Sequence, residues 1–461
     1  MTVTSTARRS AALLLALGSM ANAQSVFKLD TDDEIRASAR TLAYDTMLYY
    51  HGNETGQTPG ILPGPPPGGD YYWWEGGALW GTMLDYWHYT GDSSYNSVIS
   101  QALLFQVGEG VDYQPRNHTA SLGNDDQGFW GMSAMLAAEL NFPNPPSDQP
   151  QWLALAQAVW NTQAAPDRHD ETCGGGMRWQ IPLSNNGYNY KNTIANGCFF
   201  NLGARLARYT GNSTYMKYAE ETWDWLVNIG YIADNWDIYD GAHVESNCTD
   251  INKAQFSYNA AVLLQGMAYL YDFTDGSQRA MWKTRIDGLL ARTLEVFFPD
   301  NIAYEVSCEP GLTCTTDMYS FKGYVHRWLT NLVQLVPDTA DKIKPVLKTS
   351  AQAAVNQCVG GDSQRACGFS WKSGKFDGKM GAGQQMNVLA AVSTLLVDSA
   401  KGPLTASSGG TSKGDVNAGS NSPYQREHAP ITTGDRAGAG ILTVIVLAAA
   451  TGTFGWMSWE R

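Results

Sequence analysis

One pattern recurs through most of this chain: a strongly apolar helical stretch that opens with polar or aromatic residues. The openings are Trp74-Glu75, Asp125-Asp126, Asn192 to Asn196, Tyr258-Asn259, Phe321-Lys322 and Gln384-Gln385. They are roughly sixty residues apart, which is too long for the common solenoid repeats and suits one inner helix, one outer helix and two loops. Two of these stretches, 258–268 and 386–396, are apolar on nearly every face, so we expect them to be buried.

Six such helical hairpins predict an all-α fold, the (α/α)6 toroid, over residues 24–400. The first outer helix is expected from Asp32 to Tyr50. The inner helices of a toroid run parallel to one another, so their N-termini meet at one end. The polar openings are therefore expected to line a depression at that end.

One opening carries two adjacent carboxylates, Asp125 and Asp126, in the stretch GNDDQGFW at 123–130. Asn124 is a favourable N-cap, which places both aspartates in the first helical turn, where the helix dipole favours anions. Acidic residues at a helix start are also ordinary structural features. The flanking glycines, however, let a ligand approach the backbone, and Trp130 is suited to stacking on a sugar ring. Two neighbouring carboxylates are the minimum equipment for glycoside hydrolysis.

The first residues have the features of a secretory signal peptide. Arg8 and Arg9 precede a short apolar run, and Ala21-Asn22-Ala23 has the small-x-small pattern of a cleavage site, so we expect residues 1–23 to be removed. The alternative, a transmembrane helix, is disfavoured because the apolar run is too short. Secretion fits the four N-glycosylation sequons, at Asn53, Asn117, Asn212 and Asn247.

Seven cysteines follow the cleavage site, and an oxidising compartment favours disulfides among them. The expected pairs are Cys308–Cys314, Cys358–Cys367 and Cys173–Cys248. Cys198 lies in an apolar stretch and is expected to be a buried free thiol. No cysteine spacing is typical of a zinc site and the histidines are scattered, so neither a metal nor a cofactor is expected.

The chain is acidic, with a formal net charge of −13. This charge argues against nucleic acid or anionic lipid as the main partner. The chain also contains 16 tryptophans and 23 tyrosines. A secreted, acidic and aromatic-rich chain favours a neutral carbohydrate ligand. The alternative is that the aromatic residues fill a large core.

The composition changes after Ala400. Residues 401–436 are rich in Gly, Ser, Thr and Asn and have no periodicity, which predicts a disordered stalk. Residues 437–459 carry no charge, so the tail 437–461 is expected to direct attachment of a glycosylphosphatidylinositol (GPI) anchor at one of residues 419–421. A single-pass membrane anchor stays open, because the spacer is long and the tail ends in Glu460-Arg461.

The Asp125-Asp126 motif resembles the catalytic pair of glycoside hydrolase family 76, the α-1,6-mannanases. Shorter stretches resemble the same family: Arg178 to Gln180, Tyr190 to Thr193, Asn196 to Leu202, Tyr258-Asn259 and Phe321 to Gly323. The similarity covers about 32–400, and the fungal, GPI-anchored cell-wall branch is the most similar. The family's frequent Tyr-Asn-Gln-Gly reads Tyr-Asn-Ala-Ala at 258–261, so contacts of the last two positions are not carried over.

This resemblance implies a retaining, endo-acting α-mannosidase that hydrolyses α-1,6 linkages in mannan. Asp125 would be the nucleophile and Asp126 the general acid/base. Backbone N–H groups are expected to keep Asp125 ionised, and its charge to raise the pKa of Asp126. The expected substrate-binding residues are Trp74, Trp130, Trp179, Asn196, Asp240, Tyr258, Asn259 and Lys322.

The cell-wall branch leaves a second activity open, the transfer of GPI-linked mannoproteins to wall glucan, because a sugar hydroxyl can replace water in resolving the covalent intermediate. A third alternative is a glycan-binding wall protein with an inactive site. The expected partners are mannan or the GPI-core glycan, with wall glucan as the acceptor in the second case. The expected location is the plasma membrane or the cell wall.

Overall fold

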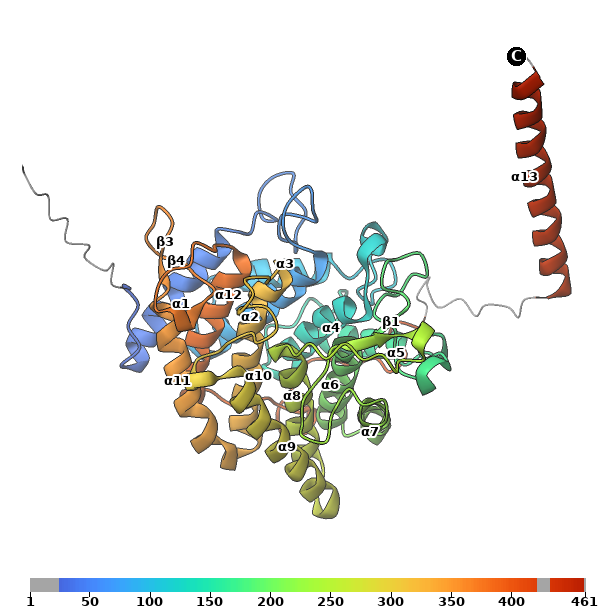
Figure 1. The fold of residues 1–461 in the computed structure, drawn as a ribbon. Coiled ribbons are helices and arrows are strands. Elements are labelled where there is room, and N and C mark those ends of the chain that lie inside the picture. The colour runs from blue at the N-terminus through green and yellow to red at the C-terminus, as the bar shows by residue number, and fades with distance from the viewer. Residues whose placement is uncertain (1–24, 421–431, 460–461) are drawn as a thin grey trace, which may run out of the picture.

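The structure is a computed structural model that describes residues 25–420 and 432–459. The predicted signal peptide and Asn421 of the predicted anchor site lie outside these residues. In the described body, helices alternate between an inner and an outer ring (Figure 1). The inner helices are α2 (Trp73–Thr90), α4 (Asn124–Glu139), α6 (Thr193–Thr210), α8 (Ser257–Phe273), α10 (Phe321–Leu335) and α12 (Ala382–Ser393). The outer helices are α1 (Asp32–Met47), α3 (Asn96–Phe105), α5 (Trp152–Gln163), α7 (Ser213–Asn228), α9 (Gly276–Phe297) and α11 (Ala340–Val355).

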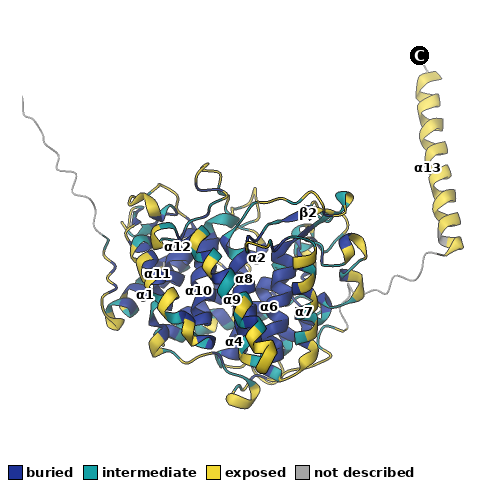
Figure 2. Cartoon of the chain, turned by 60° about the horizontal axis from the view of Figure 1, so that its bottom comes forward, coloured by how far each residue is buried: buried dark blue, intermediate teal, exposed yellow. Residues whose placement is uncertain are grey.

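The inner helices form a closed ring. Each packs on the next, from α2 through α12, and α12 packs back on α2 and on α1. Their side chains are buried on nearly every face, whereas the outer helices expose one side to solvent (Figure 2). The predicted (α/α)6 toroid of six helical hairpins is therefore confirmed, and the first outer helix ends at Met47 rather than Tyr50.

Local sequence signals set the helix ends. Thr31 accepts a hydrogen bond from the backbone N–H of Glu34, whose carboxylate accepts in return from the N–H of Thr31, forming a capping box at the start of α1. Helices α2 and α6 each end in Thr-Gly, and the glycine takes a left-handed φ of 74° at Gly91 and 75° at Gly211. Only glycine adopts this conformation without strain, which explains the sharp ends.

Strands are short and lie in the loops of the described body. β1 (Tyr190–Asn192) pairs antiparallel with β2 (Gly241–His243), and β3 (Cys358–Gly360) pairs antiparallel with β4 (Ala366–Cys367). Three disulfides are present as predicted: Cys173–Cys248, Cys308–Cys314 and Cys358–Cys367. Cys198 is buried and free, also as predicted.

The disordered stalk predicted for 401–436 is wrong for its first part. Residues 401–420 lie against the body, and we refer to them as the C-terminal strap. Backbone groups of the strap bond to side chains of the toroid: the N–H of Thr411 donates to Asn141 Oδ1 at 2.9 Å, and Asn161 Nδ2 donates to the carbonyl of Ala418 at 2.8 Å. Composition did not reveal this because most hydrogen bonds between the strap and the toroid use the backbone of the strap.

The C-terminal helix α13 (Thr433–Trp459) begins a few residues before the predicted tail. The stretch Arg436–Trp459 is long and apolar enough to cross a membrane, with mean hydropathy 1.9. None of this stretch is buried against the body. It stands apart from the toroid in both views (Figures 1 and 2).

Candidate active site

The two adjacent aspartates lie in the first turn of α4, half-buried, at the end where the inner helices begin. Gly123 is the N-cap, one residue before the predicted Asn124. Asp126 Oδ2 accepts a hydrogen bond from the N–H of Gly123 at 2.7 Å, and Asp125 Oδ2 accepts one from Trp179 Nε1 at 3.0 Å. The side chain of Asn124 instead fixes the neighbouring loop, donating to the carbonyl of Arg178 at 2.8 Å. The carboxylates of Asp125 and Asp126 therefore have different hydrogen-bond partners.

The aspartates line a cleft with a volume of about 620 Å³. Trp179 lies on one side of the pair, with Tyr190 and Asp240 beyond it. Trp74 and Asp317 lie on another side, where Trp74 Nε1 donates to Asp317 Oδ1 at 2.9 Å. The cleft residues are Tyr72, Trp74, Ala120, Ser121, Asp125, Asp126, Phe129, Trp179, Gln180, Asn186, Tyr190, Asn192, Asp240, Asn252, Phe256, Tyr258, Thr315, Asp317, Met318 and Phe321.

The cleft is acidic and aromatic. Its lining includes four aspartates, and among the described residues that line it there is no lysine or arginine. Tyr258 and Phe321 stack in parallel with ring centroids 3.8 Å apart, which forms a flat apolar wall. Aromatic faces with a few carboxylates are suited to sugars, whose rings have apolar faces and hydroxyl edges.

Burial raises the pKa of both catalytic candidates. For Asp125 it raises the pKa to about 7, against the lowering effect of two backbone N–H groups and the Trp179 indole. Burial and the neighbouring Asp125 charge together raise the pKa of Asp126 well above its usual range. Asp126 therefore retains its proton to higher pH than Asp125. Burial and the Asp125 charge thus favour the expected order of the two pKa values, although burial opposes the ionisation expected of Asp125.

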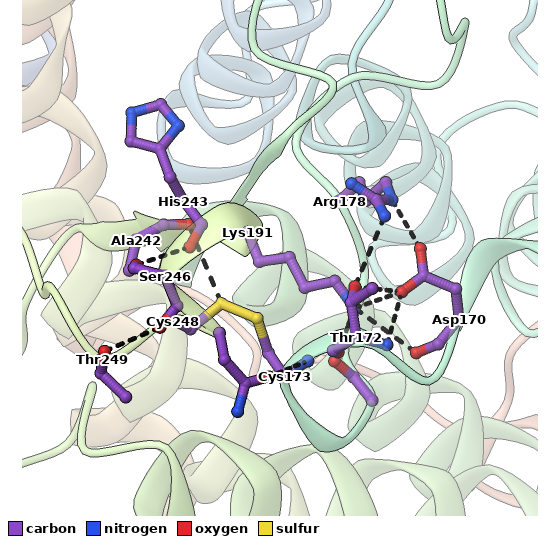
Figure 3. Close-up of a disulfide and its surroundings, with 12 residues drawn as sticks. Asp170, Thr172, Cys173, Arg178, Lys191, Ala242, His243, Ser246, Cys248 and Thr249 are labelled. Carbon is purple, nitrogen blue, oxygen red and sulfur yellow. Dashed lines mark hydrogen bonds and ion pairs between the residues drawn. A yellow bond between two sulfur atoms is a disulfide. The ribbon is translucent and has the colours of Figure 1, made fainter.

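A buried ionic cluster positions the loop that carries Trp179 (Figure 3). Lys191 on β1 is fully buried, and its Nζ donates to Asp170 Oδ1 at 3.0 Å and to the carbonyls of Thr172 and Gly175 at 2.8 Å each. Arg178 also pairs with Asp170, at 2.5 Å. Against the raising effect of burial, the Thr172 hydroxyl together with these two cations holds the pKa of Asp170 well below its usual range. The loop before Trp179 is therefore fixed to the sheet.

The disulfide Cys173–Cys248 joins the same loop to the segment that follows β2 (Figure 3). The β1–β2 pair then carries the part of the cleft wall that lies beyond Trp179. Tyr190 donates its hydroxyl to Asp240 Oδ2 at 2.7 Å, and the N–H of Trp179 donates to the carbonyl of Tyr190 at 2.7 Å. Covalent and ionic links outside the cleft thus fix the side chains inside it.

Four of the predicted substrate-binding residues line the cleft: Trp74, Trp179, Asp240 and Tyr258. Asn259 is buried in the first turn of α8. Burial raises the pKa of Asp240, and the Tyr190 hydroxyl and the Asn259 amide oppose that rise. Asn259 therefore supports a cleft residue rather than lining the cleft itself.

The structure places the other three predicted substrate contacts outside the lining of this cleft, with their side chains buried. Trp130 is stacked on Trp73, with centroids 5.2 Å apart, and belongs to the core. Asn196 bonds to both the N–H and the carbonyl of Met177, at 2.8 and 3.1 Å, and so shapes the loop before Arg178. Lys322 forms a buried ion pair with Glu309 at 2.6 Å.

Sequence reasoning missed Asp317, the fourth carboxylate of the cleft. It lies in a short 3-10 helix, Asp317–Ser320, directly before α10. Burial raises its pKa, and Trp74 lowers it by donating a hydrogen bond. Its position four residues before the polar opening Phe321-Lys322 was the available signal. Among the described residues, no group of three or more His, Cys, Asp or Glu side chains is arranged to hold a metal ion.

Comparisons with known proteins agree with this geometry. The model of the family described as Glycosyl hydrolase family 76 matches residues 34–407. Mannan endo-1,6-alpha-mannosidase DCW1 of Saccharomyces cerevisiae is 44% identical over 423 residues, which covers 91% of this chain and 92% of the relative. The protein of the same name from Eremothecium gossypii is 44% identical over 454 residues, 96% of each chain.

Among solved structures, Dfg5 from Chaetomium thermophilum in complex with glucosamine has a TM-score of 0.85 and 61% sequence identity, and the match covers 88% of this chain and 100% of that one. An inactive variant of the α-1,6-mannanase GH76A of Salegentibacter sp. HEL1_6, in complex with α-1,6-mannotriose, has a TM-score of 0.62. It is 17% identical to this chain and the match covers 79% of this chain and 99% of that one, so this likeness shows the fold alone.

Proposed function

This chain belongs to glycoside hydrolase family 76, and we propose that it is a retaining, endo-acting α-mannosidase that hydrolyses α-1,6-mannosidic linkages in mannan during fungal cell-wall biogenesis. The observation that carries the proposal is the pair Asp125 and Asp126 in a cleft that extends to both sides of it. An endo-acting enzyme needs such a cleft, because the polymer must continue past the cleaved bond in both directions.

The two environments support the proposed roles of nucleophile for Asp125 and acid/base for Asp126. Asp125, whose ionised form receives backbone and indole hydrogen bonds, attacks the anomeric carbon and forms a glycosyl-enzyme ester. Asp126, which retains its proton, donates it to the departing glycosidic oxygen and later takes a proton from the attacking water. Neighbouring residues in a helix point about 100° apart. In the proposed mechanism the different hydrogen-bond partners of the two carboxylates would direct both at one bond.

The surrounding residues would orient the polymer. Trp179 and Trp74 offer ring faces on two sides of the pair, and Asp240 and Asp317 offer carboxylate oxygens to sugar hydroxyls. Tyr190 and the Trp74 indole each hold one of these carboxylates. No cofactor or metal takes part in the proposed reaction.

A second activity is favoured by a specific observation: the transfer of GPI-linked mannoproteins to wall glucan. Glucosamine, the ligand in the Chaetomium thermophilum Dfg5 structure, is a sugar with a free amino group. An amino group is cationic at neutral pH, and a cleft with four aspartates and no basic side chain in its described lining favours such a cation. The same two aspartates would catalyse both activities, with a sugar hydroxyl in place of water.

Substitution of each aspartate tests the mechanism. Asp125→Asn should lose nearly all activity, because no glycosyl-enzyme forms. Asp126→Asn should regain its first step with an α-mannosyl fluoride, whose leaving group needs no proton, and the intermediate should accumulate as a mass increase on Asp125. Azide should rescue Asp126→Asn with retained configuration and a variant lacking the nucleophile with inverted configuration. If the two variants show each other's expected behaviour, the roles of Asp125 and Asp126 are reversed. Wild-type activity in either variant would remove the pair from the mechanism and favour the alternative of a glycan-binding protein.

Products distinguish the two activities. The wild-type protein should convert an α-1,6-mannan oligosaccharide to shorter mannan in water. A glucan oligosaccharide added to the reaction should yield a mixed product only if transfer competes with hydrolysis.

We also propose that the chain passes through the secretory pathway to the cell surface and is held there through a GPI anchor. The apolar helix Arg436–Trp459 supports a C-terminal anchor. A phospholipase specific for phosphatidylinositol should release the protein from fungal membranes. Retention of the protein together with its tail would show that α13 itself is the anchor.

A further inference from the structure

Two stacked rings of the cleft come from neighbouring inner helices. Tyr258 is the second residue of α8 and Phe321 is the first residue of α10, and we refer to these two rings as the aromatic wall. Helices α8 and α10 pack side by side in the ring (Figure 1). Each helix carries only one of the two rings. The stack therefore depends on the contacts that set the two helix starts relative to each other.

The segment 305–309, between α9 and α10, bonds to the start of α8. Glu305 is fully buried, and its Oε2 accepts a hydrogen bond from the N–H of Ser257 at 3.1 Å. Its Oε1 accepts a second hydrogen bond from the Ser257 hydroxyl. Ser257 directly precedes Tyr258, so the Glu305 carboxylate fixes the backbone from which the first ring of the wall extends.

Ser307 in the same segment bonds to the chain just before α8. Its hydroxyl accepts a hydrogen bond from the N–H of Gln255 and donates one to the carbonyl of Gln255, at 2.8 Å each. Gln255 precedes Phe256, a cleft residue that packs edge-on against Phe321 with ring centroids 5.8 Å apart. The segment 305–309 thus holds the chain on both sides of Phe256.

The segment also bonds to the start of α10. Glu309 Oε1 forms an ion pair with Lys322 Nζ at 2.6 Å and accepts a hydrogen bond from the N–H of Glu305 at 2.7 Å. Lys322 directly follows Phe321 and is fully buried, and its Nζ also donates to the carbonyl of Phe369 at 2.7 Å. We refer to Glu305, Glu309 and Lys322 as the buried bridge. It joins the starts of both helices that carry the aromatic wall.

The buried bridge is itself held in one geometry. The N–H of Glu309 donates to the carbonyl of Glu305 at 2.9 Å, and the disulfide Cys308–Cys314 closes the chain around Glu309 into a small loop. Burying two carboxylates and one ammonium group costs free energy, and apolar side chains of similar volume are often as stable. Hydrogen bonds and ion pairs, however, fix distance and angle. A stack of two rings needs such control, because its contact depends on their offset and tilt.

We propose that the buried bridge positions the aromatic wall, and that the wall binds a sugar ring of the mannan. The inference rests on the proposed function, because it takes mannan as the substrate. The residues of the bridge are positioning residues, since none of them lines the cleft. The wall contacts the sugar in the bound substrate and in the transition state alike. Its displacement should therefore raise KM and leave kcat little changed.

The test is steady-state hydrolysis of α-1,6-mannotetraose by the full chain. Glu305→Leu removes both acceptors of Ser257, so KM should rise about two- to tenfold, the effect expected from one aromatic contact, while kcat stays within about twofold. Glu305→Gln retains an acceptor and gains a donor for Ser257 and should keep the wild-type KM. An unchanged KM in folded Glu305→Leu, or a loss confined to kcat, would overturn the proposal.

A double substitution shows whether Glu305 acts through the wall. Tyr258→Ala removes one ring of the stack and should itself raise KM. Adding Glu305→Leu to Tyr258→Ala should raise KM no further, because no stack is left to position. If the two increases in KM multiply instead, Glu305 acts independently of the wall and the proposal is wrong.

A milder variant covers the case in which Glu305→Leu does not fold. Ser257→Ala removes only the hydroxyl bond to Glu305 and leaves the N–H bond in place. Ser133→Ala is the matched control, because this buried hydroxyl in α4 donates to the carbonyl of Gly77 on α2 at 2.7 Å and does not line the cleft. Ser257→Ala should raise KM and Ser133→Ala should not. Equal KM values in the two variants would contradict the inference.

Binding measured apart from catalysis separates this inference from the proposed function. In the Asp125→Asn background, calorimetry with α-1,6-mannotetraose should give a Kd that Glu305→Leu raises by a factor similar to that in KM. Binding without hydrolysis by the wild-type protein would reject the proposed hydrolysis, while the ratio of Kd values would still decide the role of the bridge. Hydrolysis with equal Kd values would reject the bridge alone. If mannotetraose does not bind, the wall does not take mannan and the inference is wrong.

Discussion

The hydrogen bond from Trp179 to Asp125 is expected to set the acidic limit of activity. Trp179→Phe keeps an aromatic ring at the cleft wall but removes the indole N–H, which lies 3.0 Å from Asp125 Oδ2. A hydrogen bond to a charged group contributes about 1.5–3 kcal/mol. Trp179 is 36% exposed, so water weakens the bond and the lower value, about 1.5 kcal/mol, applies. That energy corresponds to about one pKa unit.

The direction of the shift in the pH profile follows from which protonation state of Asp125 reacts. Ionised Asp125 is the nucleophile, and the indole N–H stabilises the ionised form, so its loss raises the pKa of Asp125. Activity falls as pH drops through this pKa. The acidic limb of kcat/KM against pH should therefore move to higher pH by about one unit. At pH values below this limb kcat/KM should fall roughly tenfold, and at pH values above it kcat/KM should change little. The limb reports the coupled pair rather than one residue.

Trp74→Phe is the matched control. It removes an equivalent indole bond, at 2.9 Å, but to Asp317. The pKa of Asp317 should rise, and since the Asp317 charge raises the pKa of Asp125, its partial neutralisation should not move the limb upward. A loss in Trp179→Phe that is equal at every pH would refute the reasoning and leave sugar stacking as the role of Trp179.

Two further predictions concern stability. Replacing Cys173 and Cys248 by alanine opens a loop with a sequence separation of 75 and should lower the free energy of unfolding by about 4 kcal/mol, measured by urea denaturation; an unchanged midpoint would contradict this value. Lys322→Met leaves Glu309 and Glu305 buried without their cation and should cost about 3–5 kcal/mol. Burial raises the pKa of Glu305 to about 7, and a raised carboxyl pKa loses stability as pH rises, so this deficit should be larger at pH 8 than at pH 5.

The toroid could be predicted from sequence because its two requirements are local. Inner helices must be apolar on nearly every face, and they must all begin at the same end of the toroid. The first requirement shows in the sequence as apolar stretches, and the second as their regular spacing of about sixty residues. The catalytic motif was visible for the same reason: Asp125 and Asp126 are adjacent in sequence. The loops before and after β1 could not be placed, because their positions depend on Lys191 and the disulfide rather than on any periodicity.

Helical phase explains why Trp130 and Lys322 lie outside the cleft lining. Phe129 follows Asp125 by four residues, about 40° round the helix, and lines the cleft; Trp130 follows by five, about 140° round, and points to Trp73. Lys322 differs in the same way from its neighbour Phe321, which does line the cleft. Asp317 was missed because it lies in a 3-10 segment outside the helical pattern.

The ring closes between the first and last helices of the described body, with consequences for how the protein is made. The apolar face of α1 packs on α12, which follows it by about 350 residues. A ribosome adds about 5–20 residues per second, so α1 waits roughly 20–70 s for its partner. During that time its apolar face is open to chaperones in the compartment where the chain folds. Completion of synthesis, rather than any local step, sets the moment at which the cleft acquires its final shape.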